Sequence, residues 1–237
     1  MRLHVRFFAA LLAVSTLALC AGTRSQAQST ASPTAGNGTY IVVDPLAGVR
    51  YDNRYDISLG MAYDHMKAGP TLLQGSNLGG LDLSASYWFA KHWGVEGSGR
   101  AYLGSSGTAP NTDGGGGGIR GPFVAQYLGV AGPEWLGPHN KHGALSAHLM
   151  VGGAYGDFEK ELRGYSPATV DFYNNQIAPA AIIGGHIDLN RSAHWVFRFT
   201  PDAVMTHYSL NYGPKTAQYD VNFAISVGVE YKFKKKR

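Results

Sequence analysis

The chain has little charge and almost no cysteine. Only 15% of its 237 residues are charged, against about 25% in a typical soluble domain, and Cys20 is its single cysteine. This composition excludes a coiled coil, a highly charged disordered chain and a disulfide scaffold. In place of charge the sequence has 32 glycines and 14 tyrosines. Glycine at about double its usual share indicates many strands and turns.

Long apolar runs are also lacking, except at the N-terminus. There a basic start is followed by the apolar run Phe7 to Ala21 and by small residues at the cleavage positions in Ser25 to Ala27. The run is too short for a membrane span, so residues 1–27 are predicted to be a signal peptide that is cut after Ala27. A lipoprotein site at Cys20 is the weaker alternative, because the preceding Leu19 is not small.

Removal of this segment leaves a nearly neutral mature chain. The segment holds three arginines and no acid, so the basic count falls from 20 to 17 against 16 acids. A net charge of about +1 gives no electrostatic argument for nucleic-acid binding. No later stretch reaches eighteen consecutive apolar residues, so the sequence predicts no membrane helix.

From Tyr55 onward, apolar and polar residues alternate with the period of two that is typical of strands. The last segment, Tyr219 to Phe233, shows the clearest alternation, whereas Phe123 to Ala131 is apolar on both faces and its phase stays open. Eight such segments of about ten residues fit strands that cross a bilayer at a tilt. They cover approximately residues 55–64, 81–89, 95–103, 123–131, 145–155, 177–188, 195–202 and 219–233.

The connections between these segments tend to alternate in length. Those at Ala90 to His92 and Asn190 to Ser192 are short, and Pro133 to Gly143 is intermediate. An up-and-down outer-membrane barrel has short periplasmic turns and longer outer loops, which matches this pattern. The longer connections centre on residues 67–76, 105–120, 157–175 and 210–217.

Aromatic residues gather at the strand ends, as expected at membrane interfaces. On the presumed periplasmic side they are Trp88, Phe89, Trp93, Trp135, Trp195, Tyr231 and Phe233, and on the other side Tyr63, Tyr155, Tyr208 and Tyr219. A soluble β-barrel or sandwich is the alternative. It would place charged residues on its solvent face, but here the polar face is mostly Ser, Gly and Ala, which favours the lining of a small barrel.

The chain resembles the small outer-membrane β-barrels of the OmpA-like superfamily over roughly residues 54–233. The signal peptide and the short turn in Tyr87 to Gly94 carry this resemblance, together with the segments Gly143 to Tyr155, Phe197 to Asp202 and Phe223 to Phe233. These motifs imply an architecture rather than an activity. One difference is that the last aromatic, Phe233, is followed by a basic tail.

We therefore predict an all-β fold, an eight-stranded antiparallel up-and-down transmembrane β-barrel in the outer membrane. The predicted parts are a signal peptide (1–27), a linker or short periplasmic segment (28–53), the barrel (54–233) and a basic C-terminal tail (234–237). Such closure satisfies every backbone polar group in lipid.

The inward face carries several charged residues. An eight-stranded barrel is just wide enough to be filled by side chains, and buried charges must be paired. A salt-bridged interior is therefore expected, with a proton or small-ion path as the alternative. The residues of this expected network are Asp82, Glu96, Arg100, Arg198, Asp202 and Glu230.

Other motifs give weaker signals. His207 and Ser209 resemble the His-x-Ser pair of outer-membrane lipid A deacylases, but Leu210 stands where that family has Asn. The glycine run after Asp113 lacks the ending of a phosphate loop, and two histidines beside the turn at 138–142 are a poor metal signal. The sequence predicts no catalytic, cofactor-binding or metal-ligating residue.

The expected function is a structural or surface-interaction role, with partners bound by the external loops at 104–120 and 157–175. A narrow channel and a lipid A deacylase using His207 and Ser209 are the alternatives. Expected partners are outer-membrane lipid, lipopolysaccharide and the outer-membrane assembly machinery, with no nucleic acid, for a monomeric barrel.

Overall fold

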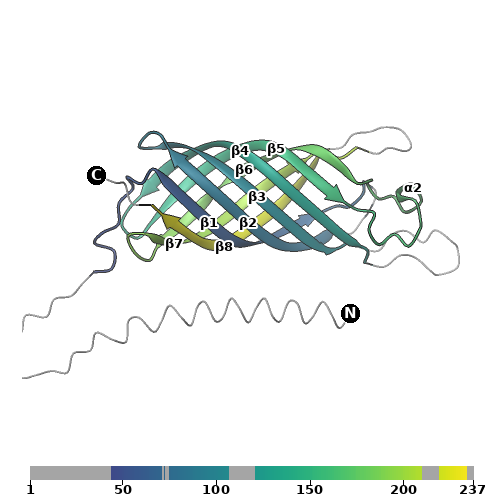
Figure 1. The fold of residues 1–237 in the computed structure, drawn as a ribbon, viewed down its shortest axis with the longest axis horizontal. Helices are drawn as coiled ribbons and strands as arrows, with labels where there is room; N and C mark the ends of the chain where they lie inside the picture. The colour runs from purple at the N-terminus through teal and green to yellow at the C-terminus, as the bar shows by residue number, and fades with distance from the viewer. Residues whose placement is uncertain (1–43, 71, 73–74, 107–120, 210–218, 234–237) are drawn as a thin grey trace, which may run out of the picture. The chain divides into compact units, whose positions relative to one another are not determined.

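Eight antiparallel strands close into a single barrel in the computed structural model (Figure 1). Each strand pairs with the next, and β1 pairs with β8, so that Leu59 lies opposite Val229 and no sheet edge is left open. The predicted eight-stranded up-and-down topology is confirmed. The strands are β1 Tyr55–Met66, β2 Ser76–Trp88, β3 Trp93–Ser105, β4 Phe123–His139, β5 Gly143–Asp157, β6 Gln176–Asn190, β7 Trp195–Thr206 and β8 Asp220–Lys232.

The structure describes residues 44–233 except 71, 73–74, 107–120 and 210–218. The predicted signal peptide, most of the predicted linker and the basic tail at 234–237 lie outside the described residues, as does the glycine run after Asp113. Within the described part, the barrel forms one compact unit with the segment that precedes β1. No helix in that part has the length and hydropathy of a membrane span.

The alternation along each strand separates an apolar outer face from a polar inner one. In β8, Val227 and Val229 are exposed, whereas Ser226 before them and Glu230 after them are buried. The same pattern holds in the other strands, where Leu, Ile, Val and aromatic side chains point outward. So large an exposed apolar surface is the lipid-contacting face of a transmembrane barrel.

Aromatic side chains ring both ends of this apolar face, with two exceptions. At the end with the short turns, Trp93 pairs with Trp135 across β3 and β4, and the rings of Trp195 and Tyr231 lie 4.9 Å apart. Two residues expected at the interfaces instead belong to the interior: the indole of Trp88 donates to the buried Asp56, and Tyr208 is fully buried. The expected interfacial positions of Trp88 and Tyr208 are therefore wrong.

β4 is longer than the sequence pattern indicated. Residues 133–139 continue the strand, whereas the segment from Pro133 to Gly143 was expected to be a connection. Pairing with β3 and β5 extends through this part, and a register shift between Leu136 and His139 accommodates it. The phase of β4 is now fixed, because Gln126 and Glu134 are buried inside and Tyr127 and Trp135 are exposed.

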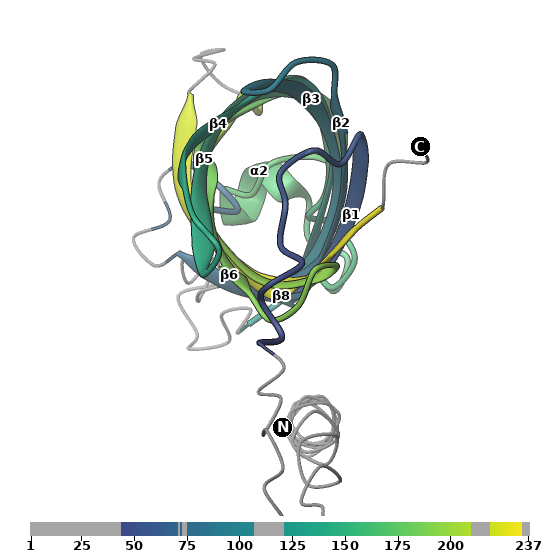
Figure 2. The ribbon, with the colours of Figure 1, turned by 90° about the vertical axis from the view of Figure 1, so that its left-hand side faces the viewer.

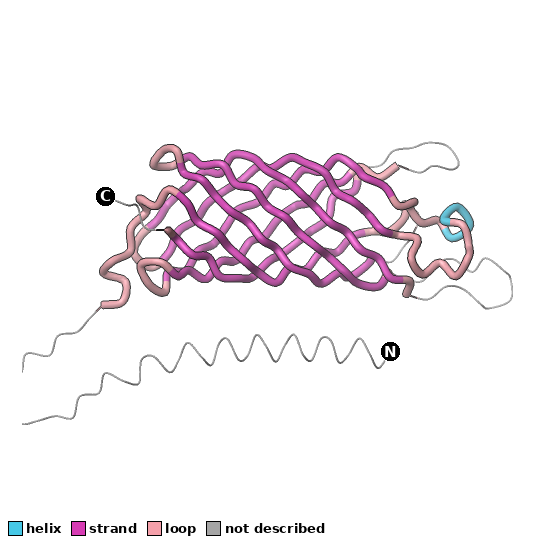
Figure 3. The backbone as a smooth tube through the Cα atoms, viewed as in Figure 1, coloured by secondary structure: helices cyan, strands magenta, loops and turns pink. Residues whose placement is uncertain are grey.

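At the end with the long loops, a buried aromatic cluster fills the barrel. The side chains of Phe158, Phe172, Tyr173 and Tyr208 are at most 1% exposed, and three of their rings lie 5.1–5.7 Å apart. The loop at 158–175, which contains the short helix α2 (Pro167–Val170), folds over this end (Figure 3). By the usual arrangement of such barrels, this is the outer end.

At the opposite end, residues 44–54 cross the barrel mouth (Figure 2). The Tyr51 hydroxyl donates to the Asn140 carbonyl at 3.0 Å and accepts from the Asn190 amide at 2.7 Å. The ammonium of Lys232 lies 4.4 Å from the Tyr51 ring centroid. Burial raises the pKa of the Tyr51 phenol, so the hydroxyl stays protonated and can donate at neutral pH. This segment contains no strand and instead covers the short-turn end.

Close strand packing makes one glycine sensitive to substitution. A Cβ added at Gly132 would overlap the Leu149 carbonyl oxygen of β5, whereas one added at Gly129, on the same strand, would meet nothing within 4 Å. We expect Gly132→Ala to lower the free energy of unfolding by about 1–3 kcal/mol, because the clash is with backbone. Urea unfolding in detergent micelles, followed by tryptophan fluorescence, measures this. Equal unfolding midpoints for Gly132→Ala and Gly129→Ala would contradict the prediction.

Candidate functional site in the barrel interior

The barrel interior holds more acids than bases. Among the described residues, eight buried carboxylate side chains face three buried Arg or Lys and two buried His. Charges inside a barrel are stable only when they are paired and hydrogen-bonded. The acids are Asp56, Asp64, Asp82, Glu96, Glu134, Asp188, Asp202 and Glu230, and the others are Arg100, Arg198, Lys232, His148 and His186.

The middle of the interior is organised around Arg100 of β3. Its guanidinium Nη2 lies 2.5 Å from Asp202 of β7, and its Nε lies 3.4 Å from Asp82 of β2. Hydroxyl groups complete the shell of Asp82, which accepts from Ser98 and from Ser226, each at 2.9 Å. Arg100 therefore connects strands on opposite sides of the barrel and blocks the space between them.

Two histidines lie next to this group, toward the short-turn end. His148 of β5 places Nε2 2.9 Å from Asp202 and Nδ1 2.9 Å from Glu96 of β3. His186 of β6 places Nε2 3.1 Å from the same Glu96 oxygen and 3.7 Å from Glu134 of β4, and its Nδ1 lies 2.9 Å from the Thr200 hydroxyl. The two rings meet edge to face, with Nδ1 of His148 3.2 Å from Nε2 of His186.

Nearest the short-turn end, Arg198 of β7 forms ion pairs with two buried acids. Its Nε and Nη2 donate to the two oxygens of Asp188 at 2.9 and 3.0 Å, a bidentate arrangement, and Nη2 also lies 3.0 Å from Glu230. Glu134 is nearby and accepts from the Ser146 hydroxyl at 3.1 Å.

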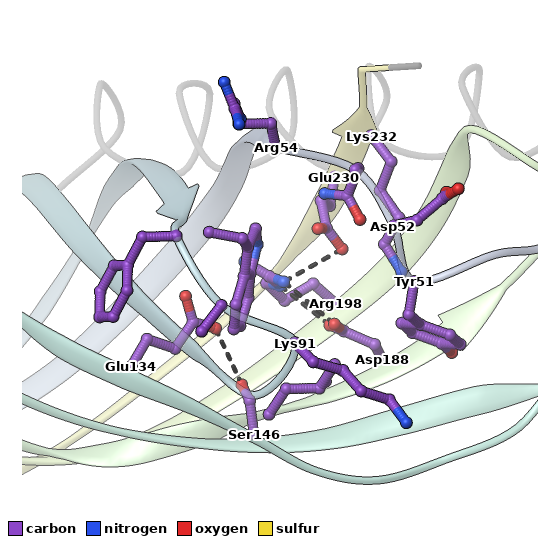
Figure 4. A pocket seen from close by; sticks show the side chains of 15 residues that line it. Tyr51, Asp52, Arg54, Lys91, Glu134, Ser146, Asp188, Arg198, Glu230 and Lys232 are labelled. Atoms are coloured by element: carbon purple, nitrogen blue, oxygen red, sulfur yellow. Dashed lines mark hydrogen bonds and ion pairs between the residues drawn. The ribbon is translucent and has the colours of Figure 1, made fainter. Parts of the chain in front are cut away.

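A cavity of about 290 Å³ lies between this group and the covering segment at 44–54 (Figure 4). Glu134, Asp188 and Glu230 line its inner wall, and Arg54, Lys91 and Lys232 lie around it in Figure 4. The cavity thus reaches from the short-turn end to Glu134, whose side chain lies between the cavity and the histidines.

The structure places all six residues of the expected charge network inside the barrel, where each is at most 7% exposed. They form two groups rather than one, because Arg100 contacts Asp82 and Asp202 whereas Arg198 contacts Glu230. Glu96 joins neither arginine and contacts the histidines instead. Sequence reasoning missed the pair His148 and His186, and it also left out Asp56, Asp64, Glu134, Asp188 and Lys232. Most of these lie at the inward phase of their strands, which was the available signal.

His207 and Ser209, the residues of the alternative deacylase hypothesis, lie apart from this interior. The Ser209 hydroxyl donates to the Gln176 side chain at 3.1 Å. The His207 ring packs 4.2 Å from the ring of Tyr219, and no hydrogen bond joins His207 to Ser209 among the described contacts. His139, one of the two turn histidines, lies against Tyr51 at the short-turn end, with ring centroids 4.5 Å apart.

The fold can be compared with those of known proteins. No family model and no curated protein sequence matches the chain. Among solved structures, the outer membrane protein OprG from Pseudomonas aeruginosa aligns with a TM-score of 0.52 and 15% identity over 79% of this chain and 99% of OprG. The chain has the fold of a small outer-membrane β-barrel. The Ail protein of Yersinia pestis also aligns, with a TM-score of 0.46 and 16% identity over 76% of this chain and 99% of Ail.

The expected resemblance to small outer-membrane barrels is thereby confirmed at the level of the fold. Identities of 15–16% say nothing of activity or ligands, so the role of this barrel has to be argued from its own residues.

The ion pairs of Arg198 provide a test of the interior. Arg198→Met removes the cation that pairs directly with the buried Asp188 and Glu230, so we expect the free energy of unfolding to fall by about 3–5 kcal/mol. Urea unfolding in detergent micelles measures the change. The matched control is Lys141→Met, which removes an exposed ion pair with Asp44 and should leave the unfolding midpoint unchanged. A midpoint for Arg198→Met within error of the control would show that the buried pairs contribute nothing.

Proposed function

We propose that this outer-membrane barrel is closed to solutes and acts through its outer surface, as a structural or surface-interaction protein. The observation that carries the proposal is the filled interior. Arg100 and the histidines bridge the middle of the barrel, and the aromatic cluster around Tyr208 fills its outer end. A channel needs a continuous polar lumen, and this arrangement argues against one.

Hydrogen bonds fix the conformation of the outer loop at 158–175, and this supports a role in binding. Its Asn175 side chain accepts from the backbone N–H groups of Phe158 and Glu159 at 2.7 and 3.1 Å. Tyr173 donates from its hydroxyl to Asp220, the first residue of β8, and from its backbone to the Ala68 carbonyl in the connection between β1 and β2. A loop held in this way can bind a partner without first losing conformational freedom.

Two exposed basic side chains on this loop can contact an anionic partner, whereas its acids Glu159 and Glu161 already accept hydrogen bonds from neighbouring residues. Lys160 and Arg163 are exposed on it, and the Lys160 ammonium lies 5.0 Å from the Phe123 ring centroid. The outer leaflet presents phosphorylated lipopolysaccharide head groups at this height of a barrel. Lipopolysaccharide is thus the partner that we propose for the outer rim, on a barrel that is monomeric, is inserted by the outer-membrane assembly machinery and binds no nucleic acid.

A non-enzymatic role is part of the same proposal. The Ser209 hydroxyl is occupied by Gln176 rather than by His207, and a general base must reach the hydroxyl that it activates. A lipid A deacylase would need this pair to rearrange. We therefore expect the lipid A mass spectrum of cells that express the protein to equal that of cells that express Ser209→Ala, and a deacylated species lost only in the variant would contradict this.

Conductance tests closure of the barrel. We expect the wild-type protein in planar lipid bilayers to give no discrete openings, because ion pairs and aromatic rings fill the interior. A sixteen-stranded porin in the same bilayers is the positive control, since it encloses an aqueous channel. Openings of constant size that change in Arg100→Ala would overturn the proposal of a closed barrel.

Lipopolysaccharide binding tests the outer rim. The double variant Lys160→Ser/Arg163→Ser should bind purified lipopolysaccharide at least about tenfold more weakly than wild type, since each exposed basic residue near an anionic surface contributes about 1 kcal/mol. Isothermal titration calorimetry of the protein in phosphatidylcholine nanodiscs measures this.

The matched control for that experiment is Lys91→Ser/Lys141→Ser, which removes two exposed basic residues from the short-turn end. It should bind as wild type does. An equal loss in both double variants would mean that net charge, rather than the outer loop, determines binding.

A further inference from the structure

Three ligand atoms from three strands converge inside the barrel. They are Nδ1 of His148, Nε2 of His186 and Oε2 of Glu96, and all lie within 4.8 Å of one another. Their mutual distances are 2.9, 3.1 and 3.2 Å. Atoms on neighbouring corners of a tetrahedral zinc site lie about 3.3 Å apart, because the bonds to nitrogen and oxygen are about 2.0–2.1 Å long. The cluster therefore needs little movement to surround a metal ion.

The outer nitrogen of each imidazole is held by a further partner. Nε2 of His148 lies 2.9 Å from Asp202, and Nδ1 of His186 lies 2.9 Å from the Thr200 hydroxyl. When each of these nitrogens carries its proton, the lone pairs of the other two nitrogens point at the shared space. Ligating histidines in metalloproteins are oriented in this way, often by a carboxylate.

Glu134 supplies a fourth group beside this cluster. One of its oxygens lies 3.7 Å from Nε2 of His186, and its side chain is fully buried. Its other oxygen, Oε2, has no hydrogen-bond partner among the described residues, and neither has Oε1 of Glu96. A buried carboxylate oxygen without a donor is costly, and a bound cation would satisfy it.

The charge balance of the interior points the same way. Eight buried carboxylates outnumber three buried Arg or Lys side chains, and protonation of both histidines would still leave an excess of acid. A divalent cation at the cluster reduces this excess without requiring protons on the imidazoles. The cavity of about 290 Å³, whose lining includes both acidic and basic side chains, leads from the short-turn end to Glu134 and offers the ion a route inward.

From these observations we propose that His148, His186 and Glu96, together with Glu134, bind one divalent transition-metal ion of the zinc type inside the barrel. Two imidazole nitrogens and two carboxylate oxygens suit Zn²⁺ in fourfold coordination better than Mg²⁺ or Ca²⁺, which prefer oxygen ligands alone. The ion would join β3, β4, β5 and β6. The proposal is independent of the outer-surface function, since it concerns residues on the other side of Arg100.

Metal stoichiometry tests it directly. The mature protein, purified from outer membranes without a polyhistidine tag, is treated with chelator, exposed to Zn²⁺, dialysed and analysed by mass spectrometry of the metal. We expect about one equivalent of zinc per chain. Less than a tenth of an equivalent would overturn the proposal.

Variants then locate the site. His148→Gln and His186→Gln should each weaken Zn²⁺ binding at least about 100-fold, and Thr200→Val, which removes the partner of His186, should weaken it about 10–100-fold. His139→Gln is the matched control, a histidine at the short-turn end outside the cluster, and should bind as wild type does. Full zinc binding in a His148→Gln/His186→Gln double variant would place the metal elsewhere and contradict the assignment.

A measurement on the unaltered chain covers the case in which these variants do not fold, which the absence of a heat-modifiable band on gels would reveal. Co²⁺ is added to the wild-type protein in place of Zn²⁺. Four-coordinate Co²⁺ with nitrogen and oxygen ligands gives intense visible absorption, and we expect this band to disappear when excess Zn²⁺ is added. The weak spectrum of six-coordinate, water-bound Co²⁺ would overturn the proposal.

Discussion

An eight-stranded barrel encloses a space that is just wide enough for side chains, and every inward residue of this protein must fit that space and satisfy its polar groups there. The outward face imposes no such demand, because lipid accepts any apolar side chain. The interior is therefore where the chain differs from a generic barrel. Arg100 and the two histidines each connect strands that are not neighbours in the sheet, and Arg198 of β7 links Asp188 of β6 to Glu230 of β8. The side chains inside the barrel therefore stabilise its wall.

The kind of side chain that fills the interior changes along the barrel axis. Aromatic rings occupy the outer end, ion pairs and imidazoles the middle, and a cavity lined by charged and polar side chains the short-turn end. The apolar outer end supports the loop at 158–175, whereas the short-turn end keeps a polar space behind residues 44–54. The two ends thus suit different tasks, a firm surface toward the exterior and a sheltered polar site on the other side.

Much of the fold could be predicted because the period of two is a local property of the sequence. It places Asp82 and Arg100 on the inward face without any knowledge of their partners. The extent of β4 could not be predicted, because Gly132, Pro133 and Pro138 are typical of turns and the strand continues through them only by pairing with its neighbours. The segment at 44–54 has no periodicity, and its position depends on contacts with residues far along the chain.

The contact between His148, His186 and Glu96 also could not be predicted from the sequence. Each is a single polar residue at an inward position, and His186 lies 90 residues from Glu96. Which inward residues meet depends on the stagger of the strands around the barrel, and alternation within one strand carries no information on that stagger. For the same reason the six expected charges could be assigned to the interior, but not divided between Arg100 and Arg198.

The position of Tyr51 has a consequence for the order of folding. Its hydroxyl contacts Asn140 in the turn between β4 and β5 and Asn190 at the end of β6, 139 residues away, and its ring contacts Lys232 of β8. Tyr51 contacts all three partners at once only in the closed barrel, since one of them lies on the last strand. Contacts of such long sequence separation form late, because the entropy of closing the intervening chain is lost before they contribute. The N-terminal segment is synthesised first, yet it takes its place last.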